Sequence, residues 1–120
     1  MFAITADQVG SRNDADLVDD GLALVSRVGG DRLALPPDRT AGDELQVLTP
    51  DAGAALGLVL ALARDHHWHV GLGVGEVREP LPDATRAAAG TALIRARDAV
   101  ESAKKRPTRV AVAVDDGREP

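Results

Sequence analysis

The sequence contains no cysteine, which excludes a disulfide, a thiolate metal site and a cysteine nucleophile. Its only aromatic residues are Phe2 and Trp68, so the stacking platforms that single-strand nucleic-acid binders use are almost absent. Positive charge is also scarce, because 14 basic residues face 19 acidic ones and leave a net charge of −5. These shortages predict that the chain does not bind nucleic acid.

Long apolar runs are missing as well. The small and apolar stretch over residues 53–63 is far shorter than the roughly 20 residues that cross a bilayer. The first residues lack the basic and then apolar pattern of a signal peptide, so we expect a cytoplasmic protein without membrane contact. The length of 120 residues and the ordinary globular composition predict one domain over residues 1–114 and a polar tail over residues 115–120.

Hydrophobic spacing predicts strands and helices in the order β-α-β-β-α-β-α-β. The expected strands cover residues 2–6, 32–35, 45–49, 68–74 and 109–114, and the expected helices cover about 13–28, 50–64 and 93–105. Gly42 and Asp43 lie between two β-prone segments and predict a tight hairpin. Because a hairpin makes its strands antiparallel, we expect an α+β fold of the ferredoxin-like type, with a mainly antiparallel sheet and helices packed on one face.

Two acidic residues occupy positions that suit a metal. Asp7 ends the first expected strand and Asp43 lies at the hairpin tip, and these positions are neighbours in a ferredoxin-like sheet. Paired carboxylates there would hold Mg²⁺ or Mn²⁺, whereas the alternative is that both residues only favour turns. The backbone N–H groups of Val9, Gly10 and Ser11 are expected at a helix N-terminus, which is a favourable position for phosphate.

The expected strand over residues 68–74 carries a second polar pattern. His67 and His69 share one face with Gly71 and Gly73, opposite an apolar face. Two imidazoles without a third ligand are insufficient for a zinc site, so we interpret this face as an ordinary polar strand face. The small glycines predict the close approach of a helix or a ligand.

Three segments together carry a resemblance to known proteins. They read TADQVGSR over residues 5–12, TAGDEL over 40–45 and VGLGVGEV over 70–77. They resemble the landmarks of class III nucleotide cyclase domains, and the whole chain more closely resembles the small bacterial SatD-like family across most of residues 1–105. Diguanylate cyclases and polymerase palm domains share this layout, so the resemblance implies a cyclase-like or palm-like fold more than an activity.

The resemblance also implies roles for individual residues. Asp7 and Asp43 match the two metal-binding acids of the cyclases, and Glu44 is a third acid beside them. Arg39 falls where many cyclases have a lysine that helps to read the base. These residues, with the turn at residues 9–11, form the expected site for a metal and a nucleotide.

The chain departs from the cyclase pattern in a later helix. Cyclases carry an Asn there and, four residues on, an Arg that stabilises the transition state, but the matching positions hold Ile94 and Asp98. Arg95 and Arg97 flank the vacant Arg position and could substitute for the missing Arg only if the helix were rotated or the alignment shifted, and Ala87 replaces the base-reading Asp. Losing such an Arg costs about 10³-fold or more in rate, so we do not expect a working cyclase.

We therefore expect a degenerate cyclase-like domain, a regulatory or sensory module that binds a divalent metal and a nucleotide. The alternatives are an active metal-dependent nucleotidyl-transfer enzyme with a remodelled site, and a structural or protein-interaction domain without a ligand. Class III cyclases complete each site across a dimer interface, so the resemblance also implies a homodimer. A sheet face without helices would favour the same pairing.

Overall fold

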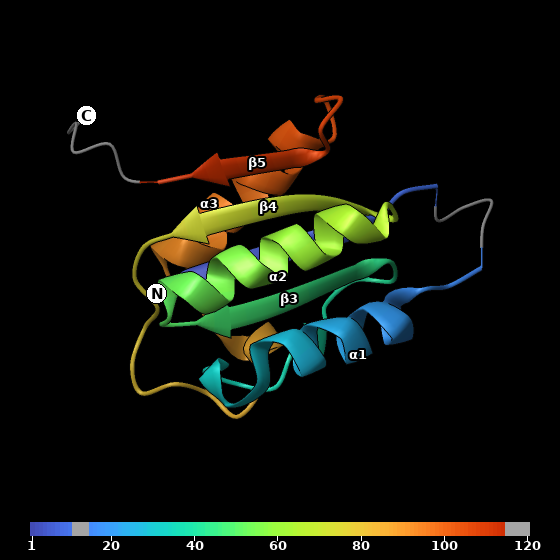
Figure 1. Ribbon diagram of the computed structural model, residues 1–120. Helices are drawn as coiled ribbons and strands as arrows, with labels where there is room; N and C mark the ends of the chain where they lie inside the picture. The colour runs from blue at the N-terminus through green and yellow to red at the C-terminus, as the bar shows by residue number, and fades with distance from the viewer. Residues whose placement is uncertain (11–14, 115–120) are drawn as a thin grey trace.

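One five-stranded sheet, of order β2-β3-β1-β4-β5, organises the molecule (Figure 1). The computed structural model describes residues 1–10 and 15–114. The strands are β1 (Phe2–Gln8), β2 (Asp38–Arg39), β3 (Glu44–Thr49), β4 (Trp68–Val74) and β5 (Val110–Ala113). The helices are α1 (Val18–Gly29), α2 (Ala52–Asp65) and α3 (Thr91–Ala103), with the short 3₁₀ helices η1 (Gly30–Arg32) and η2 (Thr85–Ala87). Strands and helices follow one another in the predicted order, but the second strand lies at residues 38–39 and not at 32–35.

The sheet is mixed, and three of its four strand pairs are antiparallel. The central strand β1 runs antiparallel to β3 and β4, β2 forms the predicted hairpin with β3, and β5 lies parallel to β4. The predicted α+β class with a mainly antiparallel sheet is therefore confirmed. The predicted tail, residues 115–120, lies outside the described residues.

The large apolar side chains gather on the sheet face that α1 and α2 cover (Figure 1). The helix α2 begins where the Asp51 carboxylate accepts hydrogen bonds from the backbone N–H groups of Gly53 and Ala54, which is ordinary N-capping. The ring of Trp68 fills the space under α1, since a Cβ on Gly21 would lie 2.5 Å from it. The buried members of this core are Ile4, Ala6, Val18, Val25, Leu45, Val47, Leu58, Val59, Leu62, Trp68 and Val70.

The prediction that all helices pack on one face is wrong, because α3 covers the opposite face (Figure 1). The connections β3-α2-β4 and β4-α3-β5 both join parallel strands and both advance toward β5. Because their helices lie on opposite faces, the two crossovers have opposite hands. The first is right-handed, as about 98% of such connections are, and the second is left-handed.

Glycine makes the close seat of α3 feasible. A Cβ on Gly71 would lie 2.2 Å from the backbone nitrogen of Val100, and one on Gly73 would lie 2.2 Å from the carbonyl oxygen of Ala92. Only a strand without side chains at these positions lets a helix backbone approach so closely. The sequence-based expectation of a close approach at these glycines is confirmed, and its partner is α3.

The segment before the hairpin differs from the sequence-based prediction. The expected strand at residues 32–35 is absent from the described residues, because the chain forms η1 and then continues to Pro36 and Pro37. One backbone hydrogen bond, from Ala34 to the carbonyl of Leu48, ties this segment to the sheet. Two prolines cannot donate to a ladder, so the paired strand β2 begins only at Asp38.

The start of α1 also differs, because a tertiary contact determines it. The Gln8 side chain accepts a hydrogen bond from the backbone N–H of Leu17 at 2.9 Å and donates one to the carbonyl of Ala15 at 2.7 Å. The Asp16 carboxylate accepts from the backbone N–H of Val18. The helix therefore begins at Val18, several residues after the expected start.

The described residues have a Cα radius of gyration of 13.2 Å. Roughly this value is expected for a globular chain of this size. None of the described helices has both the length and the apolar character that crossing a membrane requires.

Candidate functional site

Three titratable residues from three adjacent strands meet at one end of the face that α3 covers. Asp7, near the end of β1, pairs in register with Glu44 of β3 on one side and with His69 of β4 on the other. The hairpin tip lies beside them, because the backbone N–H of Gln8 donates to the carbonyl of Asp43 at 2.9 Å. The structure therefore brings together the three acidic residues that were expected to bind a metal. We call Asp7, Glu44 and His69 the polar end.

Asp7 is the most constrained member of the polar end, with 7% of its surface exposed. The ammonium of Lys104, the residue directly after α3, lies 2.7 Å from its Oδ2, whereas its Oδ1 is buried without a hydrogen-bond partner among the described residues. Burial raises the pKa of the Asp7 carboxyl, the Lys104 contact opposes that rise, and the charges of Glu44 and Asp43 add to it. One positive charge therefore compensates only part of what burial costs this carboxylate.

Glu44 has a fuller set of partners. Its Oε1 accepts hydrogen bonds from the Thr40 hydroxyl, at 2.8 Å, and from the Arg97 Nη2. This hydrogen bond is the main reason why the pKa of Arg97 is raised above its ordinary value. The Lys104 ammonium also pairs with Glu101 at 3.1 Å, so α3 supplies both cations of the site.

Arg97 and Lys104 were not among the expected site residues, although Arg97 was named beside the vacant Arg position. Alignment to the cyclase pattern placed Asp98 at the functional Arg position, yet Arg97 is the residue that reaches an acidic side chain of the sheet. The sequence did contain a signal for this pair: Arg97 and Lys104 are seven residues apart, and residues at that spacing lie on one face of an α-helix. Two cations at that spacing match two acidic residues on neighbouring strands.

His69 is the third member of the polar end. Burial, together with the charges of Arg109 and Lys104, lowers the pKa of its imidazole, and Asp7 opposes this shift. Its Nδ1 is buried and has no hydrogen-bond partner within residues 1–10 and 15–114. Within the part of the chain that the structure describes, the polar end thus contains two buried polar atoms without a partner, one on Asp7 and one on His69.

The expected phosphate-binding turn lacks the surroundings that motivated it. The backbone N–H of Val9 donates to the carbonyl of His67 at 2.8 Å, and Gly10 adopts a left-handed turn with φ 67°. Because α1 begins at Val18, the expectation that this turn lies at the helix N-terminus is wrong. Ser11, the third expected residue, lies outside the described residues.

Arg39 does not face the polar end but ties the hairpin to the beginning of α1. Its guanidinium pairs with Asp16 at 3.0 Å and with Asp19 at 3.5 Å, and it donates to the Gly42 carbonyl at 2.7 Å. The Asp16 hydrogen bond is the main cause of its raised pKa. These exposed contacts connect the hairpin to the residues around the start of α1, which is a structural role. A base-reading role for Arg39 stays a prediction.

The donor set of the polar end fits a hard divalent cation in part. Among the described residues, no three side chains of His, Asp or Glu converge closely enough to hold a metal ion by themselves. Mg²⁺ commonly uses one or two carboxylates and keeps several waters, which the unpartnered Oδ1 of Asp7 and the neighbouring Asp43 carboxylate can accommodate. Lys104 would have to give up its contact with Oδ2 for both Asp7 oxygens to bind a metal.

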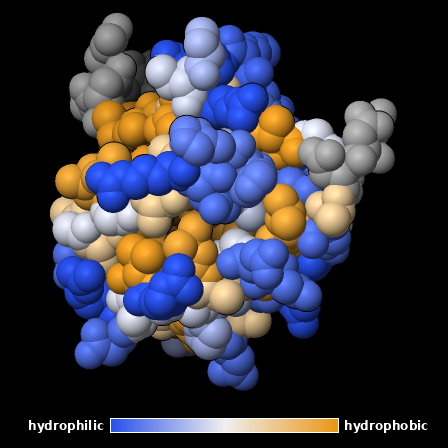
Figure 2. Space-filling view, turned by 45° about the vertical axis from the view of Figure 1, so that its right-hand side comes forward, coloured by the Kyte–Doolittle hydropathy of each residue, from blue (hydrophilic) through white to orange (hydrophobic). Residues whose placement is uncertain are grey.

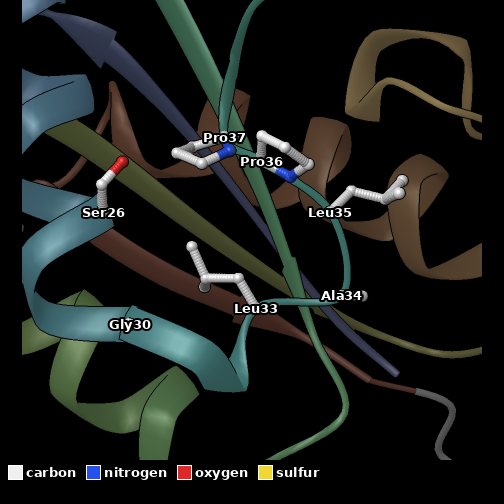
Figure 3. Close-up of a pocket in the computed structure, with 7 residues that line it drawn as sticks. All are labelled: Ser26, Gly30, Leu33, Ala34, Leu35, Pro36 and Pro37. Carbon is white, nitrogen blue, oxygen red and sulfur yellow. The ribbon is translucent and has the colours of Figure 1, made fainter.

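A hollow of about 320 Å³ lies elsewhere, between the end of α1 and the segment before β2 (Figure 3). Its lining residues are Ser26, Gly30, Leu33, Ala34, Leu35, Pro36 and Pro37. None of these side chains titrates near neutral pH, and none belongs to the expected site. This hollow therefore offers no group for metal or acid–base chemistry.

Apolar side chains stay exposed beside β5, where Figure 2 shows orange atoms next to the grey C-terminal residues at the upper left. Val112 and Val114 are each more than half exposed, as is Leu56 of α2. The premise of a helix-free sheet face, which favoured a homodimer, is wrong because α3 covers that face. The homodimer itself stays a prediction.

Comparison with protein-family models, with curated proteins and with solved structures found no match to this chain. The SatD-like and cyclase-like resemblance therefore stays a prediction, and the chemistry of the site is argued from its geometry.

Proposed function

We propose that the chain is a regulatory or sensory module of a degenerate cyclase-like or palm-like type. It binds Mg²⁺ or Mn²⁺ at the polar end through Asp7, Asp43 and Glu44, and a nucleotide through its phosphate groups. Arg97 and Lys104, rather than the turn after β1, supply the positive charge for those phosphates.

The topology of the first six elements supports the cyclase-like or palm-like part of the proposal. The order β2-β3-β1-β4, with α1 and α2 on one face, is the arrangement expected of a ferredoxin-like layer. The unit β4-α3-β5 adds a helix on the other face, and this helix carries the cations to the acidic residues. The fold alone does not imply an activity, so the function depends on the site.

The observation that carries the metal proposal is the environment of Asp7. A buried carboxylate normally has all its oxygens hydrogen-bonded or paired, but Oδ1 of Asp7 has no partner in the described part of the chain, while Asp43 and Glu44 add negative charge. A divalent cation supplies both the missing contact and the missing charge. The single ammonium of Lys104 supplies only part of them.

Thermal unfolding with and without divalent cations tests this proposal. We expect Mg²⁺ and Mn²⁺ to raise the midpoint, because a ligand that binds only the folded state stabilises it by about 2.7 kcal/mol at a hundred times its Kd. The variants Asp7→Asn and Asp43→Asn should lose this response. Asp31→Asn is the matched control, because Asp31 is exposed in η1 and should respond as the wild type does.

Two results would contradict the metal proposal: a wild-type midpoint that neither cation changes, or an Asp7→Asn variant that responds as the wild type does.

The second candidate function is an active nucleotidyl-transfer enzyme. The contact of Arg97 with Glu44 favours it, because this contact holds a guanidinium group beside the acidic residues. Samples with Mn²⁺ and a nucleoside triphosphate distinguish the two. Release of pyrophosphate that stops in Asp7→Asn would favour the enzyme.

A further inference from the structure

A cavity lies between the outer side of α3 and the segment that precedes this helix, and it shares Arg97 with the polar end. Its volume is about 610 Å³, within the range of roughly 300–1,000 Å³ typical of small-molecule sites. Ala88, Leu93 and Ile94 provide apolar lining, and Arg78, Arg97 and Asp98 provide the charged groups. The described structure thus combines apolar side chains with two arginines in the lining of one hollow.

The walls of this cavity are held in place by backbone hydrogen bonds. The N–H of Arg78 donates to the carbonyl of Ala89 at 2.7 Å, and the N–H of Ala92 donates to the carbonyl of Glu76 at 3.0 Å. The Thr91 hydroxyl accepts from the Glu76 N–H at 2.9 Å. A site whose walls are already ordered loses less entropy when a ligand binds.

The charged groups indicate the sign of the ligand. Two arginines and one aspartate line this hollow. The Arg78 guanidinium has no acceptor among the described residues, and Arg97 contacts Glu44 through Nη2 alone. Free guanidinium donors recognise carboxylate and phosphate oxygens, with geometry suited to two parallel hydrogen bonds.

The apolar part indicates that the anion has an organic body. Ile94 is 62% exposed although it lies on a well-ordered helix, and Leu93 beside it is only half-buried. An inorganic anion would leave this surface in water, whereas an aromatic or aliphatic group would cover it. We propose that this cavity binds a small organic anion, a phosphate or carboxylate with an apolar body, through Arg78 and the free donors of Arg97.

This site goes beyond the metal proposal, and its test uses no metal. Phenyl phosphate is titrated into the ¹⁵N-labelled protein in the presence of EDTA, with inorganic phosphate and benzyl alcohol as separate probes. We expect saturable shifts of the amide signals around residues 78 and 88–94. Each partial probe should bind at least about tenfold more weakly, because it lacks one of the two interactions.

Two variants test the ionic and the apolar interaction separately. Arg78→Gln should weaken phenyl phosphate about tenfold, since a hydrogen bond to a charged group is worth roughly that factor or more. Ile94→Asn should weaken phenyl phosphate but leave inorganic phosphate unchanged. Arg27→Gln is the matched control, because Arg27 is exposed at the end of α1 and should not alter binding.

Three results would overturn the proposal. They are the absence of saturable shifts, equal affinity in Arg78→Gln, and shifts that cluster at the polar end around residue 7. Because EDTA is present throughout, a failure here leaves the metal proposal standing. A loss of the Mg²⁺ response would likewise leave this cavity untouched.

Discussion

The two faces of the sheet are built on different physical principles. The face under α1 and α2 is filled by large side chains such as Ile4, Leu58 and Trp68, and its stabilisation is the ordinary burial of apolar surface. The face under α3 has alanine and glycine at one end and charged groups at the other. Buried apolar side chains stabilise the first face, whereas close backbone packing and ion pairs stabilise the second.

This difference separates stability from function within one small domain. Ion pairs contribute little net free energy because desolvation offsets their attraction, so a ligand can replace them at small cost. A ligand cannot replace the contacts of a close-packed apolar core in the same way. The α3 face is therefore where binding can alter contacts without unfolding the rest.

The largest expected effect comes from filling the glycine end of the α3 face. Valine is favoured in strands, yet Gly73→Val places a Cβ 2.2 Å from backbone atoms of Ala92 and Ala96. We expect a loss of about 4 kcal/mol or more in the free energy of unfolding, which is exceptional for one substitution. Urea denaturation measures it, with Gly73→Ala as a milder variant in case valine prevents folding.

A glycine on the other side of the sheet provides the control. Gly57 lies inside α2, and a Cβ there would meet only Val28, at 3.7 Å. Gly57→Ala should stabilise the protein by about 0.5–1 kcal/mol through helix propensity. If Gly73→Val were as stable as the wild type, α3 could not lie as close to β4 as described.

A smaller effect is expected at the charged end. A double-mutant cycle with Glu44→Gln and Arg97→Gln should give a coupling energy of about 0.5–2 kcal/mol, because the Glu44 side chain is buried while Arg97 is half exposed. The pair Arg86 and Asp38, 3.9 Å apart and more exposed, should couple by less than about 0.5 kcal/mol. Equal coupling in both pairs would mean that Glu44 and Arg97 form an ordinary surface contact.

Local patterns predicted one face of the sheet better than the other. The alternation in β4 correctly separated Trp68 and Val70 from His69 and the two glycines, because a strand has a strict period of two. The same pattern could not say which element approaches the glycines. A left-handed β4-α3-β5 crossover is against the general rule, so the position of α3 was not predictable from element order.

The candidate site was predictable only where it depends on strand pairing. Asp7 and Glu44 are neighbours because the hairpin lies beside β1, which the sequence indicated. The partners of Asp7 and Glu44 depend on how α3 is rotated about its axis, so the contacts of Lys104 and Arg97 with them were not predicted. The prediction that the turn at Val9 lies at a helix N-terminus was wrong for a similar reason, because a contact of the Gln8 side chain sets the start of α1.

The smallest effect, and the one that distinguishes the two kinds of acidic residue, is a dependence of stability on pH. Asp7 has a pKa raised above its ordinary 3.8 by burial, whereas Asp16 has a pKa lowered from 3.8 by its hydrogen bond with Arg39. Ionising Asp7 therefore costs stability as the pH rises from below 3.8 through its raised pKa. Ionising Asp16 adds stability, which is lost as the pH falls through its lowered pKa.

The variants Asp7→Asn and Asp16→Asn should consequently differ in sign. Relative to the wild type, Asp7→Asn should gain stability as the pH is raised from about 3 to 7, because asparagine cannot ionise. Asp16→Asn should lose stability relative to the wild type over the same rise, since it cannot form the ion pair with Arg39. Urea denaturation at several pH values, without divalent cations, measures both differences. An Asp7→Asn curve that runs parallel to the wild-type curve would show that Lys104 compensates Asp7 fully, and this would remove the charge deficit on which the metal proposal rests.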